Sequence, residues 1–226
     1  MKFARAFSFI FEDEQWLVRI APLVLLTIAS FIPLLGLVAL VFILGYLFLL
    51  ARDVRDGIQN PLPEWKNIGE KARYGGQLLL VILLYNLPLL ILGGCFWTAN
   101  AAAGGGLIIN AISIVSLCCT FPALLIYTVM AWSFLAVATS RYMDKDDFNV
   151  YFRIVNNWDV LTSNSALVRQ WATYATITNL LLIIGLLIPV IGWLFVAIFA
   201  IPVHGHLLGQ FARRLNIQAK VIKHEG

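Results

Sequence analysis

Residues 17–50 read LVRIAPLVLLTIASFIPLLGLVALVFILGYLFLL, and Arg19 is the only charged residue among them. The stretch is long enough for two helices of about 15–18 residues, close to the length that crosses a bilayer at 1.5 Å per residue. A break is needed in its middle. Pro33 supplies one, because proline cannot donate to the helix before it and a glycine follows three residues later. We therefore predict a hairpin of two membrane spans, residues 14–31 and 35–55.

The composition of the whole chain is also strongly apolar. Of its 226 residues, 61% are hydrophobic and 12% are charged, and the formal net charge is +4. A soluble domain carries about 25% charged residues, so this chain has too little polar side chain to coat a surface in water. High hydrophobicity also excludes an intrinsically disordered chain. The composition predicts a helical membrane protein with several spans.

Two further apolar blocks extend this plan. The second block contains predicted spans over residues 77–97 and 107–139, joined by a stretch rich in glycine and alanine. Residues 107–139 include Pro122, so this piece is either one kinked span or two segments. The third block divides at a proline into predicted spans over residues 166–187 and 191–212. The chain thus has six spans, or seven if Pro122 breaks the fourth.

The positions of the basic residues favour six spans. All 16 Lys and Arg residues lie in four regions, residues 2–19, 52–73, 141–169 and 213–223. Basic residues near membrane ends favour the cytoplasmic side, and six spans place all four regions there if the N-terminus is inside. We therefore expect an all-α, multi-pass bundle of six transmembrane helices, arranged as three hairpins in a single domain over residues 1–226. Both termini are expected to be cytoplasmic.

One short sequence occurs twice at equivalent places. Ile32-Pro33-Leu34-Leu35-Gly36 recurs as Ile188-Pro189-Val190-Ile191-Gly192, each at the tip of a hairpin that enters from the cytoplasm. The two copies would have the same orientation, unlike the inverted repeats of many secondary transporters. The alternative is that this sequence is simply a good turn between apolar helices. The sequence leaves both interpretations open.

The segments beside the spans are predicted to be short amphipathic helices at the cytoplasmic interface. They are residues 3–13, 62–73 and 147–162. Aromatic rings with a polar tip are suited to the level of the lipid headgroups. The expected interfacial anchors are Trp16, Trp65 and Trp158. The alternative role for these segments is a gate or a docking surface.

Residues that could carry out catalysis or ion coupling are scarce in the predicted spans. None of the 12 carboxylates lies in the core of a span, and no common catalytic or phosphate-binding motif occurs. The three cysteines lack the spacing of metal ligands. His204 and His206 are about 200° apart around a helix, so they cannot bind one metal together without other ligands. We expect no cofactor and no enzymatic activity, and two structural histidines.

Uncharged polar residues inside the spans are the remaining candidates for a site. Those that could line a cavity are Asn86, Thr120, Tyr127 and Asn179, together with His204 and His206. Such groups either form hydrogen bonds between helices or line a site for a neutral or lipid-like ligand. Both interpretations stay open from the sequence.

Several spaced motifs carry a family resemblance. They are Phe9-x-Phe11-x-Asp13-x-x-Trp16, Gly45-Tyr46, Arg52-x-Val54, Gly57, Leu62-Pro63-Glu64-Trp65 and His206-Leu207-Leu208-Gly209. The chain resembles the prokaryotic membrane family called domain of unknown function 4013. The resemblance implies a multi-span protein of a prokaryotic cytoplasmic (inner) membrane. It implies no activity, because the family has no established catalytic or binding residues.

The functional expectation follows from these observations. The chain is expected to be a non-enzymatic integral membrane protein, an accessory or scaffold subunit or a lipid-organising component of a membrane assembly. Its expected partners are membrane lipids and other membrane subunits or further copies of itself, but not nucleic acid. The alternative is a transporter or channel for a neutral or amphipathic solute. A water-accessible cavity in the middle of the membrane would favour that alternative.

Overall fold

The chain is helical throughout the part that the computed structural model describes. This part comprises the backbone of residues 1–102 and 107–225 and the side chains of residues 1–98, 101 and 120–216. The helices are α1 (Arg5–Ser8), the 3₁₀ helix η1 (Phe9–Glu12), α2 (Trp16–Ala29), α3 (Leu35–Asp56), α4 (Ile68–Ala102), α5 (Leu107–Lys145), the 3₁₀ helix η2 (Phe148–Phe152), α6 (Ile154–Ser163), α7 (Ser165–Leu186) and α8 (Ile191–Glu225). The described residues include no strand, which confirms the predicted all-α class.

Four of the described helices contain stretches long and apolar enough to cross a membrane. These stretches are Leu35–Asp56, Ile68–Thr98, Thr120–Lys145 and Ile191–Asn216. Helix α2 is apolar but only 14 residues long, and α7 is not among the four. The helices are thus compatible with a multi-pass membrane protein. The six-span arrangement stays a prediction.

The two proline-containing turns have the same backbone structure. They join α2 to α3 and α7 to α8, and the residue after the proline has a positive φ in both, 65° at Leu34 and 63° at Val190. In both turns the next N–H donates to the proline carbonyl at 2.8 Å. This is a γ-turn with positive φ, a rare and strained conformation for a residue with a side chain. The repeated sequence therefore forms a repeated structure.

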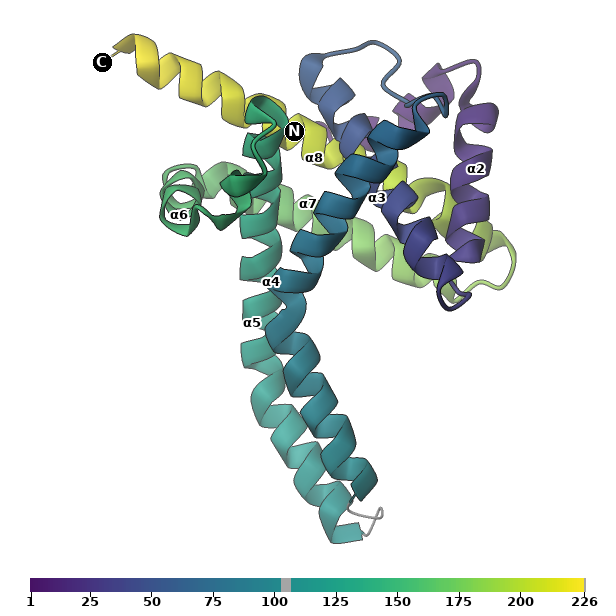
Figure 1. Cartoon of the computed structure of the whole chain (residues 1–226), viewed down its shortest axis with the longest axis vertical. Coiled ribbons are helices and arrows are strands. Elements are labelled where there is room, and N and C mark those ends of the chain that lie inside the picture. Colours follow the sequence, from purple (N-terminus) through teal and green to yellow (C-terminus); the bar gives the residue numbers. More distant parts are fainter. Residues whose placement is uncertain (103–106, 226) are drawn as a thin grey trace.

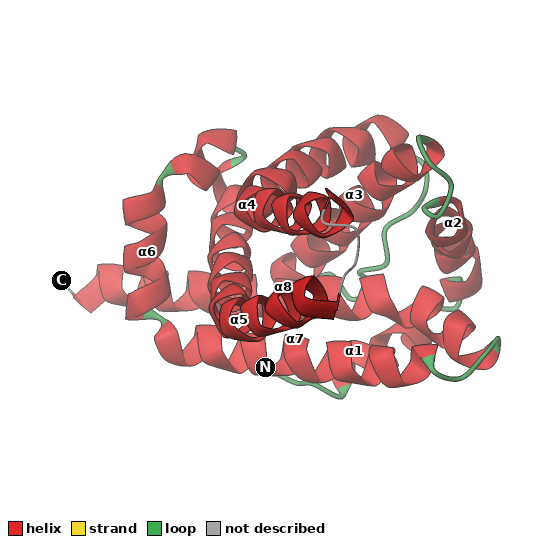
Figure 2. Cartoon of the chain, turned by 90° about the horizontal axis from the view of Figure 1, so that it is seen from below, coloured by secondary structure: helices red, strands yellow, loops and turns green. Residues whose placement is uncertain are grey.

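Helices α4 and α5 form a long hairpin that extends away from the other helices (Figure 1). Both continue through their prolines, Pro88 in α4 and Pro122 in α5. Helix α5 is therefore one helix, and Pro122 does not divide it into two segments. Seen from below, the outer ends of α4 and α5 point toward the viewer, whereas α7 and α8 run across the view (Figure 2). The α7/α8 hairpin thus crosses the outer half of the α4/α5 hairpin steeply.

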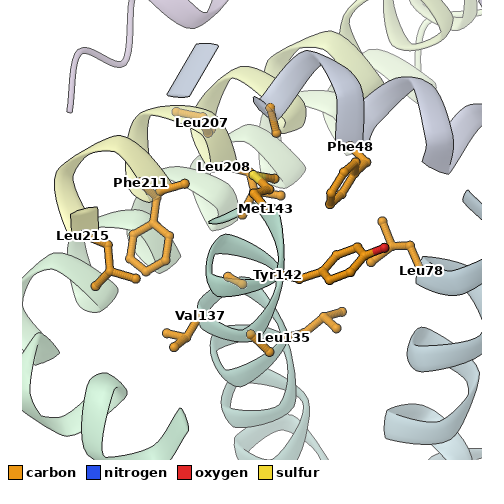
Figure 3. Packing of buried hydrophobic residues seen from close by; sticks show 14 of the residues in the cluster. Phe48, Leu78, Leu135, Val137, Tyr142, Met143, Leu207, Leu208, Phe211 and Leu215 are labelled. Carbon is orange, nitrogen blue, oxygen red and sulfur yellow. The ribbon is translucent and has the colours of Figure 1, made fainter. Parts of the chain in front are cut away.

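Helix α3 lies at the centre of the molecule and makes its most extensive contacts with α4 and α8. One cluster of buried side chains joins α3 to α4, α5, α7 and α8, and a second joins α3 to α2 and the N-terminal segment. In the first cluster, Tyr142 of α5 points toward Leu78 of α4 and Phe48 of α3 (Figure 3). The protein core is therefore built around both faces of α3.

The prediction of a separate interfacial helix over residues 62–73 was wrong. Residues 61–64 are irregular, and a helix begins only at Ile68 and continues directly into α4. Pro61 and Pro63 prevent helix formation in the first part. Neither a proline nor a turn occurs in the first turns after Ile68, so the second part becomes the start of the long helix.

The other two linker segments are helical. Residues 3–13 contain α1 and η1, and residues 147–162 contain η2 and most of α6. Helix α6 lies across the direction of the α4/α5 hairpin (Figure 2) and exposes the side chains of Ile154, Val155 and Trp158. This geometry suits a helix parallel to a membrane surface. Its position at the lipid interface remains a prediction.

Candidate functional site

Tyrosine side chains connect α4 to α5 and to the segment after α5. The Tyr127 hydroxyl donates to the main-chain carbonyl of Tyr85 at 2.7 Å, and the Tyr85 hydroxyl donates to that of Tyr151 at 2.7 Å. The Tyr151 hydroxyl donates to Thr139 Oγ1 at 3.3 Å. Burial raises the pKa of Tyr151, so this hydroxyl stays protonated at neutral pH. These groups hold the helices together and have their hydrogen bonds within the protein.

The other candidate site residues within the predicted spans lie apart from these tyrosines or form a hydrogen bond within their own helix. The Asn86 amide donates to Ile82 O of its own helix at 2.7 Å. Thr120 is exposed on α5, and Asn179 is exposed on α7. The structure therefore brings Tyr127 close to the helix turn that carries Asn86, but it does not gather the six candidates around one cavity.

The two histidines of α8 have separate environments. His204 is half-buried and donates from Nδ1 to Ala200 O of its own helix at 2.7 Å. His206 is buried and stacks on Phe9, with the ring centroids 4.3 Å apart. Its Nδ1 accepts from the Gln210 amide at 3.0 Å. His206 thus contacts the N-terminal segment through its ring, while the hydrogen bonds of both histidines lie within α8.

The N-terminal segment is attached at a second point. The Lys2 N–H donates to Gln210 Oε1 at 2.7 Å, and the Gln210 amide donates to Lys2 O at 3.1 Å. The ring of Phe3 packs against Tyr174 of α7 with the centroids 5.3 Å apart. The first residues of the chain therefore pack against the α7/α8 hairpin.

The single charge of the first apolar stretch has a partner. The Arg19 guanidinium lies 2.9 Å from Asp13 Oδ2, and both side chains are largely buried. Arg19 also donates to Leu62 O at 2.6 Å, and its own carbonyl accepts from the Trp65 indole N–H at 2.7 Å. These contacts bind the start of α2 to the linker before α4. The largely buried charge of Arg19 is thus neutralised within the protein.

The same linker covers a buried lysine. Lys71 is 1% exposed, donates to Glu64 O and lies over the ring of Trp65, 5.5 Å from its centroid. Trp65 in turn stacks on Tyr46 of α3, with the centroids 5.4 Å apart. Trp65 is therefore half-buried against protein on one side. The hydrogen bond and charge of Lys66 lower the pKa of the nearby Glu64 carboxyl.

Two open grooves lie among the charged ends of the helices. One, of about 390 Å³, lies between α5, α6 and α8, and includes Arg141, Asp144 and Asn164. The other, of about 240 Å³, lies between the end of α3 and the linker before α4, and includes Asp53 and Glu70. Within the described ranges, no three His, Cys, Asp or Glu side chains are close enough to hold a metal ion.

A family model matches residues 25–197, about three quarters of the chain, and its description is protein of unknown function DUF4013. The chain belongs to this family. Comparison with curated proteins and with solved structures gives no match. The DUF4013 match contains the motifs from Gly45 to Trp65, whereas those of residues 9–16 and 206–209 lie outside it.

The motif residues of this DUF4013 chain gather around α3. Gly45 lies against the main chain of Lys71, and a Cβ there would come within 2.0 Å of Lys71 O. Gly209 of α8 also lies close to α3, where a Cβ would come within 2.5 Å of Ala51 O. Arg52 pairs with Glu70 at 2.8 Å. Gly45, Arg52 and Gly209 thus all contribute to contacts between α3 and its neighbouring helices.

Sequence reasoning did not identify the ion pair of Arg19 and Asp13 or the burial of Lys71. The isolated position of Arg19 in an apolar stretch was a signal that it needs a partner. No comparable signal existed for Lys71, because its burial depends on how the linker folds over α3.

Proposed function

We propose that the protein is a non-enzymatic integral membrane protein that acts by association, as a scaffold or accessory subunit or as a lipid-organising component. The observation that carries this proposal is the surface of the α4/α5 hairpin. Among the described side chains of its outer half, large apolar ones are exposed on both helices, including Leu83, Leu87, Ile91, Phe121, Leu125 and Ile126. A helix pair of this kind is stable where lipid or another membrane protein covers it.

The arrangement of polar groups weighs against the alternative of a transporter or channel. Tyr127 and Asn86 both donate to main-chain carbonyls of α4, and Asn179 lies on the outside of α7. Both grooves lie among charged helix ends, away from the outer half of the α4/α5 hairpin. A path for a solute would need polar groups directed into a common cavity.

The proposed location is the cytoplasmic membrane of a prokaryote, with both termini on the cytoplasmic side. The positions of the basic residues support this orientation. In Figure 1 the N-terminus and the C-terminus lie in the upper part of the molecule, opposite the end of the α4/α5 hairpin. Six spans would require the tips of all three hairpins to reach the outer face of the membrane.

Reconstitution into lipid vesicles tests the functional proposal. Glycerol and urea permeation is measured by light scattering, and the number of copies in each complex is measured by single-molecule photobleaching. We expect permeation equal to that of empty vesicles, together with complexes of several copies or lipids that stay bound after detergent extraction. Permeation that Tyr127→Phe abolishes without lowering the melting temperature would establish the transporter alternative. A monomer that retains no lipid would contradict action by association.

A further inference from the structure

Close contacts at glycines set α3 and α4 in register. Gly45 of α3 lies against Lys71 of α4, and Gly75, one turn further along α4, lies against Val41, one turn earlier in α3. The two helices therefore run in opposite directions. The start of α3, at Leu35, is six residues before Val41. Six residues beyond Gly75 in α4 is Val81, so the start of α3 lies at about the level of Val81.

A second set of contacts aligns the two short hairpins. Gly205 of α8 lies against Leu47 of α3, and Gly209, one turn later, lies against Ala51. Helices α3 and α8 therefore run in the same direction and begin at the same level. The tips of the α2/α3 and α7/α8 hairpins, which carry the same turn, thus lie at similar depth in the molecule.

The α4/α5 hairpin continues well beyond these two tips. Helix α4 ends at Ala102, about 20 residues past the level of the tips, which is about 30 Å at 1.5 Å per residue. Figure 1 shows this projection below the α2/α3 turn. The length equals the thickness of the hydrocarbon core of a typical bilayer. The three hairpins are therefore unequal by about one membrane thickness.

This difference bears on the six-span arrangement. If the two short tips reached the outer face of the membrane, the outer half of the α4/α5 hairpin would project into water. That part exposes Leu84, Leu90 and Leu92 on α4 and Val129 on α5, each about half exposed. Two helices with an apolar surface on every side cannot be solvated in that way at low cost. The outer half of α4/α5 is thus the part that fits the hydrocarbon core.

The chemistry of the short tips indicates what surrounds them. Phe31 and its counterpart Leu187 are 84% and 77% exposed, and the tips carry no charge. Turns in water favour Gly, Asn, Asp and Ser, whereas these turns place Leu34 and Val190 at positive φ. In each turn, the N–H of the residue after Leu34 or Val190 and the N–H of the next glycine donate to carbonyls of the turn, which satisfies these irregular backbone groups as lipid requires. Both tips thus suit the hydrocarbon and not its aqueous surface.

We propose that only the outer halves of α4 and α5 cross the membrane, and that the α2/α3 and α7/α8 hairpins enter the cytoplasmic leaflet and end there, against its acyl chains. If the hydrocarbon core of the bilayer covers residues 77–97 of α4, Val81 lies about 6 Å inside the cytoplasmic edge of that hydrocarbon core. The steep crossing of α7/α8 over α4/α5 agrees with this shallow insertion (Figure 2). The inference rests on the proposed membrane location.

Cysteine labelling from the two sides of the membrane tests the topology. Single cysteines are introduced as Phe31→Cys, Leu187→Cys, Thr98→Cys and Lys66→Cys into a chain whose three native cysteines are alanine. A maleimide that cannot cross membranes is added to intact cells and to inverted vesicles. We expect Thr98→Cys to label only in cells and Lys66→Cys only in inverted vesicles. Phe31→Cys and Leu187→Cys are expected to label in neither until detergent is added.

A depth measurement completes the test. An environment-sensitive fluorophore on the Phe31→Cys or Leu187→Cys protein, attached in detergent before reconstitution, is quenched by lipids that carry a nitroxide at different positions of the acyl chain. We expect the strongest quenching from shallow and middle positions of the cytoplasmic leaflet. Labelling of either tip from outside intact cells would overturn the proposal in favour of six spans, while membrane location would stand.

The remaining outcomes separate the two proposals. If the tips label in inverted vesicles and nitroxide lipids do not quench them, the hairpins lie in water and the leaflet proposal fails. If Thr98→Cys is also inaccessible from outside and alkaline carbonate removes the protein from the membrane, the proposed integral membrane location fails as well.

Discussion

The indole N–H of Trp65 donates to the main-chain carbonyl of Arg19 at 2.7 Å, which joins the linker before α4 to the first turn of α2. Trp65→Phe removes this donor and keeps an aromatic ring against Tyr46. We expect a loss of about 1 kcal/mol in the free energy of unfolding, because the carbonyl is left without this partner. Thermal unfolding in detergent measures it. Trp158→Phe is the control, since the Trp158 side chain is 46% exposed and its loss should change little.

Two adjacent glycines of α4 should respond in opposite ways to the same substitution. A Cβ on Gly75 would come within 1.8 Å of Val41 O, whereas nothing lies within 4 Å of a Cβ on Gly76. Gly75→Ala should therefore force α3 and α4 apart and cost about 1–3 kcal/mol or more. Gly76→Ala should leave stability unchanged or raise it by about 0.5–1 kcal/mol, because alanine favours a helix. Equal melting temperatures for the two variants would contradict the close approach of α3 and α4.

The ion pair of Asp13 and Arg19 should matter more than an exposed pair. Asp13→Asn leaves the largely buried guanidinium of Arg19 without its counter-charge, which we expect to cost about 3 kcal/mol. Lys66→Ala breaks the pair with Glu64, whose members are 84% and 48% exposed, and should cost much less, because solvent screens an exposed pair. Unfolding free energies of the two variants check this order. An equal effect would mean that the Arg19 pair contributes no more than a surface pair.

The hydroxyl of Tyr127 should contribute to stability and not to permeation. Tyr127→Phe removes one hydrogen bond between α5 and α4, and such bonds in membrane proteins average about 0.6 kcal/mol. Tyr85→Phe removes a different bond, to Tyr151 O, but Tyr85 also accepts the Tyr127 bond, so the two losses should be coupled and should not simply add. Melting temperatures of the single and double variants in nanodiscs test this. A double variant that loses the full sum of the two single losses would show that the two bonds are independent.

The sequence allowed the helical class and the two proline turns to be predicted, because they depend on local properties. Uncharged apolar stretches and the steric effect of Pro33 and Pro189 act within a few residues. The linker helix of residues 62–73 was predicted wrongly for the same reason. Its apolar spacing favoured a helix, but two prolines and the contacts of Trp65 with α2 and α3 outweighed that preference.

The candidate site was less accessible to sequence reasoning. Asn86, Asn179 and Tyr127 were recognisable as polar groups in apolar stretches, but whether they meet depends on the crossing of whole helices. The parallel alignment of α3 with α8 and the greater reach of α4/α5 also arise from tertiary packing at Gly45, Gly75 and Gly209. A single glycine in an apolar helix gives no indication of which helix it will touch.

The pairing of α3 with α8 has a consequence for the order in which the protein is made. Ala51 and Gly209 touch, yet they are 158 positions apart in the sequence. During synthesis, the face of α3 that receives α8 stays uncovered until α8 has been made. Contacts between such distant residues form slowly, and an uncovered apolar face is open to wrong partners in the meantime. We therefore expect the newly made α2/α3 hairpin to be sheltered by lipid or by the insertion machinery until α8 arrives.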